Sequence, residues 1–126
     1  MRLVDTSAWI EWLVEGPAYL ALSTTMPSIE NWLLPTIVQL EITKWVIRQR
    51  NPEKSIKVSS FAHNCIIAPL DSKIALFAAE LCTKHKLATA DAIIYATALG
   101  YGADLLTCDA HFEGLDGVIY IPKLAP

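Results

Sequence analysis

The segment TADAIIYATALGYGADLLTCDAHF, residues 89–112, contains a complete helix-to-strand unit and decides the fold class of the chain. Thr89 is a helix-start residue, the apolar run Ala90–Leu99 is long enough for a helix, and the glycines of Gly100–Gly102 supply a stop. The next apolar run, Leu105–Thr107, is too short for a helix and suits a buried strand. A helix that leads directly into a buried strand is typical of sheets built from alternating strands and helices.

The same alternation extends from this unit through the rest of the chain. The other predicted strands are Leu3–Val4, Trp32–Leu34, Ile66–Ala68 and Val118–Ile121. The other predicted helices are Ala8–Glu15, Pro17–Thr25, Ile37–Arg50 with a capping box of Thr36 and Gln39, a helix that starts at Asn51-Pro52, and Ser72–His85 capped by Asp71. Elements in this order predict an α/β fold, a mostly parallel sheet with helices on both faces and right-handed crossovers.

The composition is that of one globular domain, which we predict to span residues 1–126. Hydrophobic residues make up 53% of the chain and charged residues 18%, which excludes a disordered protein. The 10 basic and 13 acidic side chains give a net charge of −3, so any nucleic acid would have to be bound by a local basic patch. Three scattered cysteines and no long apolar run near the start lead us to expect a cytoplasmic protein that binds no membrane.

Two aspartates follow predicted strands. Asp5 comes directly after Leu3–Val4, and Asp109 comes shortly after Leu105–Thr107. Because parallel strands end at the same edge of a sheet, where α/β proteins bind their ligands, we expect both carboxylates at that edge. Each also has a purely structural interpretation, Asp5 as a helix N-cap and Asp109 as a turn residue, and the sequence alone leaves both open.

Glu41 is a carboxylate on a helix face that we predict to be buried, within Ile37–Arg50. A charge in that position is costly unless it is paired or bound to a metal. The sequence therefore favours two interpretations, an ion pair with Lys44 or Arg48 or a role as a metal ligand.

Asp91 lies in the first turn of the predicted helix Ala90–Leu99, where the helix dipole alone is enough to stabilise it. The whole set of acids is harder to explain structurally, because Asp5, Glu41, Asp91 and Asp109 can all be placed around one end of the sheet. Four crowded carboxylates repel one another unless a multivalent cation neutralises them. A site made of hard oxygen ligands suits Mg²⁺ or Mn²⁺.

These motifs resemble the PIN domain family, and in particular the single-domain VapC-type toxins of toxin–antitoxin pairs. VDTSAWIEWL (residues 4–13) resembles the family's first-strand motif, and TIVQLEITKWVI (36–47) resembles its glutamate-bearing helix. The segment 89–112 resembles the central and final acidic motifs, and VIYI (118–121) resembles the last strand. The resemblance spans nearly the whole chain and implies a three-layer α/β/α sandwich with a parallel sheet of about five strands.

The resemblance also implies a function, a metal-dependent endoribonuclease that hydrolyses RNA phosphodiester bonds and acts as the toxin of a type II toxin–antitoxin system. Asp5, Glu41, Asp91 and Asp109 match the family's four acidic residues, which would be catalytic and would hold Mg²⁺ or Mn²⁺. The implied partners are an RNA substrate, a cognate antitoxin protein and a second copy of the chain.

Hydroxyl and basic side chains are further candidates for the same site. Ser7 and Thr107 match the hydroxyl residues that accompany the family's acids, although helix capping and strand ends explain them equally well. Lys44 and Arg48 share a helix flank with Glu41 and are candidate contacts to RNA phosphates. A charge cluster of this kind is also typical of a solvated helix face.

The chain departs from the family pattern in two places. KHKLATAD (residues 84–91) has no glycine where many relatives have one before the central aspartate, and Cys108 stands where a basic residue is common. The alternative function is a non-catalytic PIN-like module that binds RNA or protein, and the presence of all four acids argues against it. The histidines His63, His85 and His111 have no spacing that indicates a metal site, and Cys108 is expected to be a small buried residue.

Overall fold

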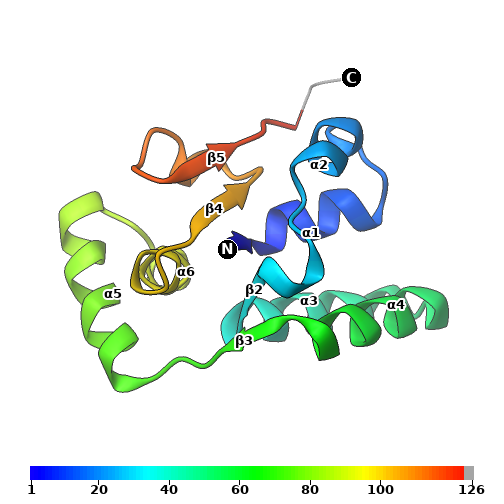
Figure 1. Ribbon diagram of the computed structural model, residues 1–126, viewed down its shortest axis with the longest axis horizontal. Helices are drawn as coiled ribbons and strands as arrows, with labels where there is room; N and C mark the ends of the chain where they lie inside the picture. Colours follow the sequence, from blue (N-terminus) through cyan, green and yellow to red (C-terminus); the bar gives the residue numbers. More distant parts are fainter. Residues whose placement is uncertain (124–126) are drawn as a thin grey trace.

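The computed structural model describes residues 1–123 and contains a five-stranded, all-parallel sheet between two layers of helices (Figure 1). The strands are β1 (Arg2–Val4), β2 (Trp32–Pro35), β3 (Ile66–Ala68), β4 (Asp104–Thr107) and β5 (Val118–Tyr120), in the order β3-β2-β1-β4-β5. The helices are α1 (Thr6–Leu13), α2 (Tyr19–Thr25), α3 (Thr36–Gln49), α4 (Pro52–Asn64), α5 (Ser72–His85) and α6 (Thr89–Gly100), with short 3₁₀ turns η1 (Ile29–Asn31) and η2 (Ala110–Phe112). The predicted α/β/α sandwich is confirmed, while the predicted domain also includes residues 124–126, outside the described part.

The strand order brings the ends of β1 and β4 together. The chain builds β1, β2 and β3 outward in one direction and then returns to place β4 on the other side of β1. Because parallel crossovers are right-handed, this reversal puts α5 and α6 on the opposite face from α1 to α4, as Figure 1 shows. Val4 pairs with Leu106, so the residues that follow β1 and β4 emerge side by side. The point where the strand order reverses is where open α/β sheets form their binding sites.

The core explains why the strands could be read from short apolar runs. Leu3, Leu33 and Leu105 on the three central strands are completely buried, as expected for a parallel sheet covered on both faces. Trp9 and Trp32 are also buried, and their ring centroids lie 4.9 Å apart. None of the helices between residues 1 and 123 is both long enough and apolar enough to cross a membrane.

Two predicted helix caps are wrong. Thr36 does not cap α3, because Pro35 takes the position before the helix and the Thr36 hydroxyl instead accepts a hydrogen bond from the Leu70 backbone N–H at 3.2 Å. Thr89 is the first residue of α6 rather than its cap, and Ala88 stands before it without a side-chain cap. In both cases the residue before the helix has an extended backbone and a side chain that cannot accept a hydrogen bond.

Candidate functional site

Asp5 lies at the carboxyl end of β1 and is also the N-cap of α1. Its Oδ1 accepts hydrogen bonds from the Ala8 backbone N–H at 3.1 Å and from the Ser7 hydroxyl at 2.7 Å. Its Oδ2 accepts a hydrogen bond from the Thr107 hydroxyl at 2.8 Å. The N-cap interpretation and the expected position at the sheet edge are therefore both correct, and Ser7 and Thr107 are the two hydroxyls that hold this carboxylate.

The charge on Asp5 is costly in this environment. The side chain is only 3% exposed, and burial raises its pKa from 3.8 to about 6. The hydrogen bonds from Ser7, Ala8 and Thr107 lower the pKa, and the negative charge of Asp109 raises it further. A cation at this position would favour the charged form that burial and Asp109 disfavour.

Hydroxyl groups also fix the segment that follows β4. The Thr107 hydroxyl accepts a hydrogen bond from the Asp109 backbone N–H at 2.9 Å, and the Ser7 hydroxyl accepts one from the Cys108 backbone N–H at 3.0 Å. Asp109 then caps η2, because its Oδ1 accepts a hydrogen bond from the His111 backbone N–H at 2.9 Å. The turn interpretation of Asp109 is confirmed, and the charge of Asp109 acts on the carboxylate of Asp5, whose pKa it raises.

Cys108 lies between Thr107 and Asp109 in the sequence, and its thiol is unreactive. The residue is buried, and burial together with the negative charges of Asp5 and Glu11 raises the pKa of its thiol to about 11. It is a free thiol that carries no thiolate near neutral pH. The prediction that it is a small buried residue is confirmed.

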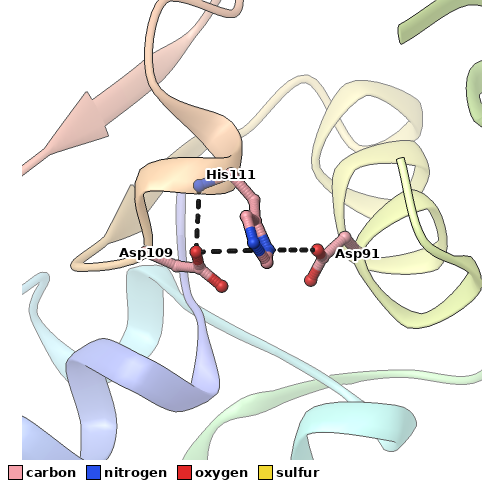
Figure 2. Close-up of side chains that lie close together, drawn as sticks. All are labelled: Asp91, Asp109 and His111. Atoms are coloured by element: carbon pink, nitrogen blue, oxygen red, sulfur yellow. Dashed lines mark hydrogen bonds and ion pairs between the residues drawn. The ribbon is translucent and has the colours of Figure 1, made fainter. Parts of the chain in front are cut away.

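Asp91, Asp109 and His111 form a compact group of possible metal ligands (Figure 2). Figure 2 shows the His111 ring between the two carboxylates, with Nδ1 3.1 Å from Oδ2 of Asp91 and 3.4 Å from Oδ1 of Asp109. One ligand atom from each residue lies within 4.8 Å of the others. Partial burial raises the pKa of Asp91, the hydrogen bond with His111 lowers it, and the charge of Asp109 raises it. The group therefore fits a divalent cation both in spacing and in charge.

His111 is the first of two residues that sequence reasoning missed, since its spacing to the other histidines gave no metal signal. It approaches Asp91, 20 positions earlier, only because Asp109 caps the 3₁₀ turn that carries it. The one available signal was the position of His111 two residues after a strand-end aspartate.

Glu41 lies on α3, half-buried, and its Oε1 accepts a hydrogen bond from the Thr6 hydroxyl at 2.6 Å. Within residues 1–123 it forms no ion pair with Lys44 or Arg48, so that interpretation is wrong. The buried face of α3 consists of Val38, Ile42 and Val46, which places Glu41 at its edge rather than on it. Thr6, which directly follows Asp5, links Glu41 to the start of α1 and is a second residue that sequence reasoning missed.

The comparison with protein families agrees with this arrangement. Residues 2–118 match the model of the PIN domain. The chain belongs to the PIN domain family. Among curated proteins, no sequence matches this PIN domain significantly.

Solved structures show the same fold over nearly the whole chain. A toxin–antitoxin complex from Klebsiella pneumoniae contains a chain that is 22% identical, with a TM-score of 0.81 over 94% of this PIN domain and 96% of that chain. FitAcB from Neisseria gonorrhoeae is 25% identical, with a TM-score of 0.76 and coverage of 97% and 98%. VapC20 from Mycobacterium tuberculosis, described as a sarcin-ricin loop cleaving toxin, is 14% identical, with a TM-score of 0.76 and coverage of 97% and 99%.

Lys44 and Arg48 lie on the outer side of α3 in this PIN domain. Both are exposed and line a groove of about 690 Å³ that also contains Leu40 and Ile47. These two apolar side chains are 62% and 70% exposed, so the basic residues border a hydrophobic surface. The pocket beside Asp91 and His111 is lined by other residues and includes none of these four side chains. Contact of Lys44 and Arg48 with RNA phosphates therefore stays a prediction.

Proposed function

We propose that this PIN domain is a metal-dependent endoribonuclease that hydrolyses RNA phosphodiester bonds and is the toxin of a type II toxin–antitoxin pair. The observation that carries the proposal is the gathering of carboxylates at the switch point between β1 and β4. The negative charge of Asp109 raises the pKa of both Asp5 and Asp91. Such a costly arrangement is explained by a divalent cation that binds among the carboxylates.

The catalytic residues in this proposal are Asp5, Glu41, Asp91 and Asp109, with Mg²⁺ or Mn²⁺ as the cofactor. Carboxylate oxygens are the ligands that both ions prefer in proteins. A bound ion would neutralise charge on the scissile phosphate and make water a better nucleophile. Ser7 and Thr107 fix the orientation of Asp5, and Thr6 fixes Glu41, so the acids are held in place before substrate arrives.

The proposed partners besides RNA are a cognate antitoxin and a second copy of the chain. Exposed apolar side chains on several helices support contact with other polypeptides. Leu20 on α2 is 80% exposed and Ile56 on α4 is 68% exposed, in addition to Leu40 and Ile47 on α3. The cytoplasm is the proposed place of action.

The direct test incubates the purified, antitoxin-free protein with total cellular RNA in Mg²⁺, Mn²⁺ or a chelator and maps the ends produced. We expect cleavage in the presence of metal, with 5′-phosphate and 3′-hydroxyl ends, and none in the chelator. The Asp91→Asn variant is expected to cleave roughly 1000-fold more slowly, because it loses one of the charges that hold the cation. Glu53→Gln is the matched control, since Glu53 occupies the first turn of α4 as Asp91 occupies that of α6.

The competing function is a non-catalytic PIN-like module that binds RNA or protein. It predicts that the wild-type protein, Asp91→Asn and Glu53→Gln leave RNA equally intact with every metal. That result would reject the nuclease proposal and make the binding module the better explanation.

His111 gives a second prediction, on metal selectivity. An imidazole nitrogen suits Co²⁺ better than Mg²⁺, which prefers oxygen ligands. We expect His111→Gln to weaken Co²⁺ binding by about tenfold while Mg²⁺ binding changes by about twofold or less. Isothermal titration calorimetry of both ions measures this, with His63→Gln on the exposed side of α4 as the control. Unchanged Co²⁺ binding by His111→Gln would show that His111 is not a ligand.

A further inference from the structure

A small pocket lies beside the candidate metal group and is not needed to hold a cation. It has a volume of about 260 Å³ and is lined by His85, Lys86, Leu87, Ala88, Asp91 and His111. Asp91 and His111 also belong to the metal group, so a molecule in this pocket lies next to the carboxylates. Drug-sized ligands occupy larger cavities, of roughly 300 to 1,000 Å³, so this volume suits a fragment such as a single nucleotide.

The lining combines an apolar surface with basic side chains. Leu87 is half-buried and Ala88 is next to it, while His85, Lys86 and His111 bring nitrogen-bearing groups to the same pocket. The His85 ring packs edge-on against Tyr95, with 5.8 Å between the ring centroids, which limits its movement. An apolar wall with imidazole rings suits the face of a nucleobase, because single-stranded RNA is bound largely by stacking.

Lys86 supplies a positive charge that is not paired with any group in the described part of the chain. Within residues 1–123 its ammonium group forms no ion pair and no side-chain hydrogen bond, and the residue is exposed. Its backbone has φ 55° and ψ 40° at the end of α5, a left-handed conformation in which glycine is the usual residue. Lys84 and His85 already complement the helix dipole at this end of α5, so the dipole does not require a third basic residue.

We propose that this pocket, called the Lys86 pocket below, binds the nucleotide adjacent to the scissile phosphodiester of a single-stranded RNA. Lys86 contacts the phosphate of that nucleotide, and the base lies against Leu87 between His85 and His111. The inference rests on the proposed nuclease function for the position of the scissile bond. The net charge of −3 strengthens it, because an acidic protein binds RNA only through local basic groups.

The test separates RNA binding from cleavage. All variants are made in an Asp5→Asn background, because Asp5 does not line the Lys86 pocket and its loss blocks the proposed hydrolysis. Binding of a fluorescent single-stranded RNA in Mg²⁺ is followed by anisotropy at several salt concentrations. Lys86→Gln is expected to weaken binding by about three- to tenfold and to reduce the slope of log affinity against log salt by about 0.7, the loss of one phosphate contact. Lys86→Arg is expected to retain binding.

Two further variants test whether weaker binding comes from a general loss of positive charge or from a less stable fold. Lys84→Gln removes the same charge two residues earlier, outside the Lys86 pocket, and is expected to change affinity by less than about twofold. Lys86→Gly removes the side chain but supplies the residue that the left-handed backbone favours. It is expected to weaken RNA binding as much as Lys86→Gln without lowering the thermal unfolding temperature.

The outcomes are distinct for the pocket and for the nuclease. Equal binding by Lys86→Gln and Lys84→Gln would overturn the Lys86 pocket, even if the wild-type protein cleaves RNA. Weaker binding of Lys86→Gln, together with a wild-type protein that cleaves no RNA in any metal, would overturn the nuclease function and leave the pocket as an RNA-binding site.

Discussion

Replacing Asp5 with asparagine is expected to slow RNA cleavage by roughly 1000-fold and, at the same time, to stabilise the metal-free protein above about pH 6. The loss of activity follows because an amide brings no charge to the proposed cation. The fold tolerates the change, since an asparagine oxygen can still accept hydrogen bonds from Ser7 and from the Ala8 backbone N–H. The Thr107 hydroxyl, which now donates to Asp5, would have to turn and accept from the new amide.

The gain in stability depends on pH in a defined direction. Burial raises the pKa of Asp5 from 3.8 to about 6, so the folded protein binds this proton more tightly than the unfolded chain does. The stability of the metal-free protein therefore falls as pH rises from about 4 to 6 and stays low above that. At about 1.4 kcal/mol per pKa unit, the ionised carboxylate costs roughly 3 kcal/mol. Asp5→Asn avoids this cost, so its advantage is largest above about pH 6 and disappears below about pH 4.

Denaturant unfolding in a chelator, at several pH values, measures this difference in the free energy of unfolding. Asp71→Asn is the matched control, because Asp71 caps α5 with a hydrogen bond from the Ile74 N–H at 2.8 Å but is exposed. That variant is expected to show no stabilisation at high pH. If Asp5→Asn instead destabilises the protein at pH 8, the carboxylate stabilises the fold itself. The explanation that it destabilises the metal-free protein until a cation binds would then be wrong.

The fold could be predicted from the sequence because its main signals are local. A strand of a parallel sheet is buried on both faces, so β2, whose four residues are all buried, could be read from the apolar run Trp32–Leu34. Asp71 could be recognised as the start of α5 because an N-cap residue bonds to a backbone N–H only a few positions later in the sequence. Thr36 failed as a cap because its hydroxyl bonds to the distant residue Leu70, and Thr89 failed because α6 begins at Thr89 itself, with Ala88 before it.

The site was less predictable because its contacts join residues far apart in the chain. The sequence placed Asp5 and Asp109 at one sheet edge because both follow strands that were predicted to be parallel. It could not show that Thr6 holds Glu41, 35 positions away, or that His111 reaches Asp91. It also misplaced Glu41 on the buried face of α3, because a helical pattern of apolar residues does not reveal which residues lie at its edge.

Gly16→Ala is expected to destabilise the protein by about 2 to 3 kcal/mol, the largest effect we expect from so small a change. Glu11 on α1 is 5% exposed, and its Oε2 accepts a hydrogen bond from the Ala18 backbone N–H at 2.8 Å, just before α2. A Cβ at Gly16 would clash with Oε1 of Glu11. The methyl group would therefore push the carboxylate off Ala18 and leave a buried charge and a backbone donor without partners.

A double-mutant cycle tests this cause. In a Glu11→Ala background the clash is gone, so we expect Gly16→Ala to cost about 0.5 kcal/mol or less, and the two substitutions to be strongly non-additive. Gly100→Ala in α6 is the control for the glycine change itself, because its Cβ would meet only a methyl group of Ile74, at 3.1 Å. Additive costs for Gly16→Ala and Glu11→Ala would contradict this explanation.

Comparing Gly16→Ala with Asp5→Asn distinguishes residues that stabilise the fold from residues that act in the proposed reaction. Glu11 stabilises the junction between α1 and α2. Asp5 and Ser7 act at the opposite end of α1, where Asp5 bonds to the last residue of β4 and Ser7 to the residue after it. A variant weakened at Gly16 should therefore unfold at a lower temperature but cleave RNA at nearly the wild-type rate while it is folded. Asp5→Asn is expected to behave in the opposite way in a chelator, with a more stable fold and no cleavage when metal is restored. Opposite responses of this kind indicate that the carboxylates are retained for chemistry, at a cost in stability that the rest of the fold offsets.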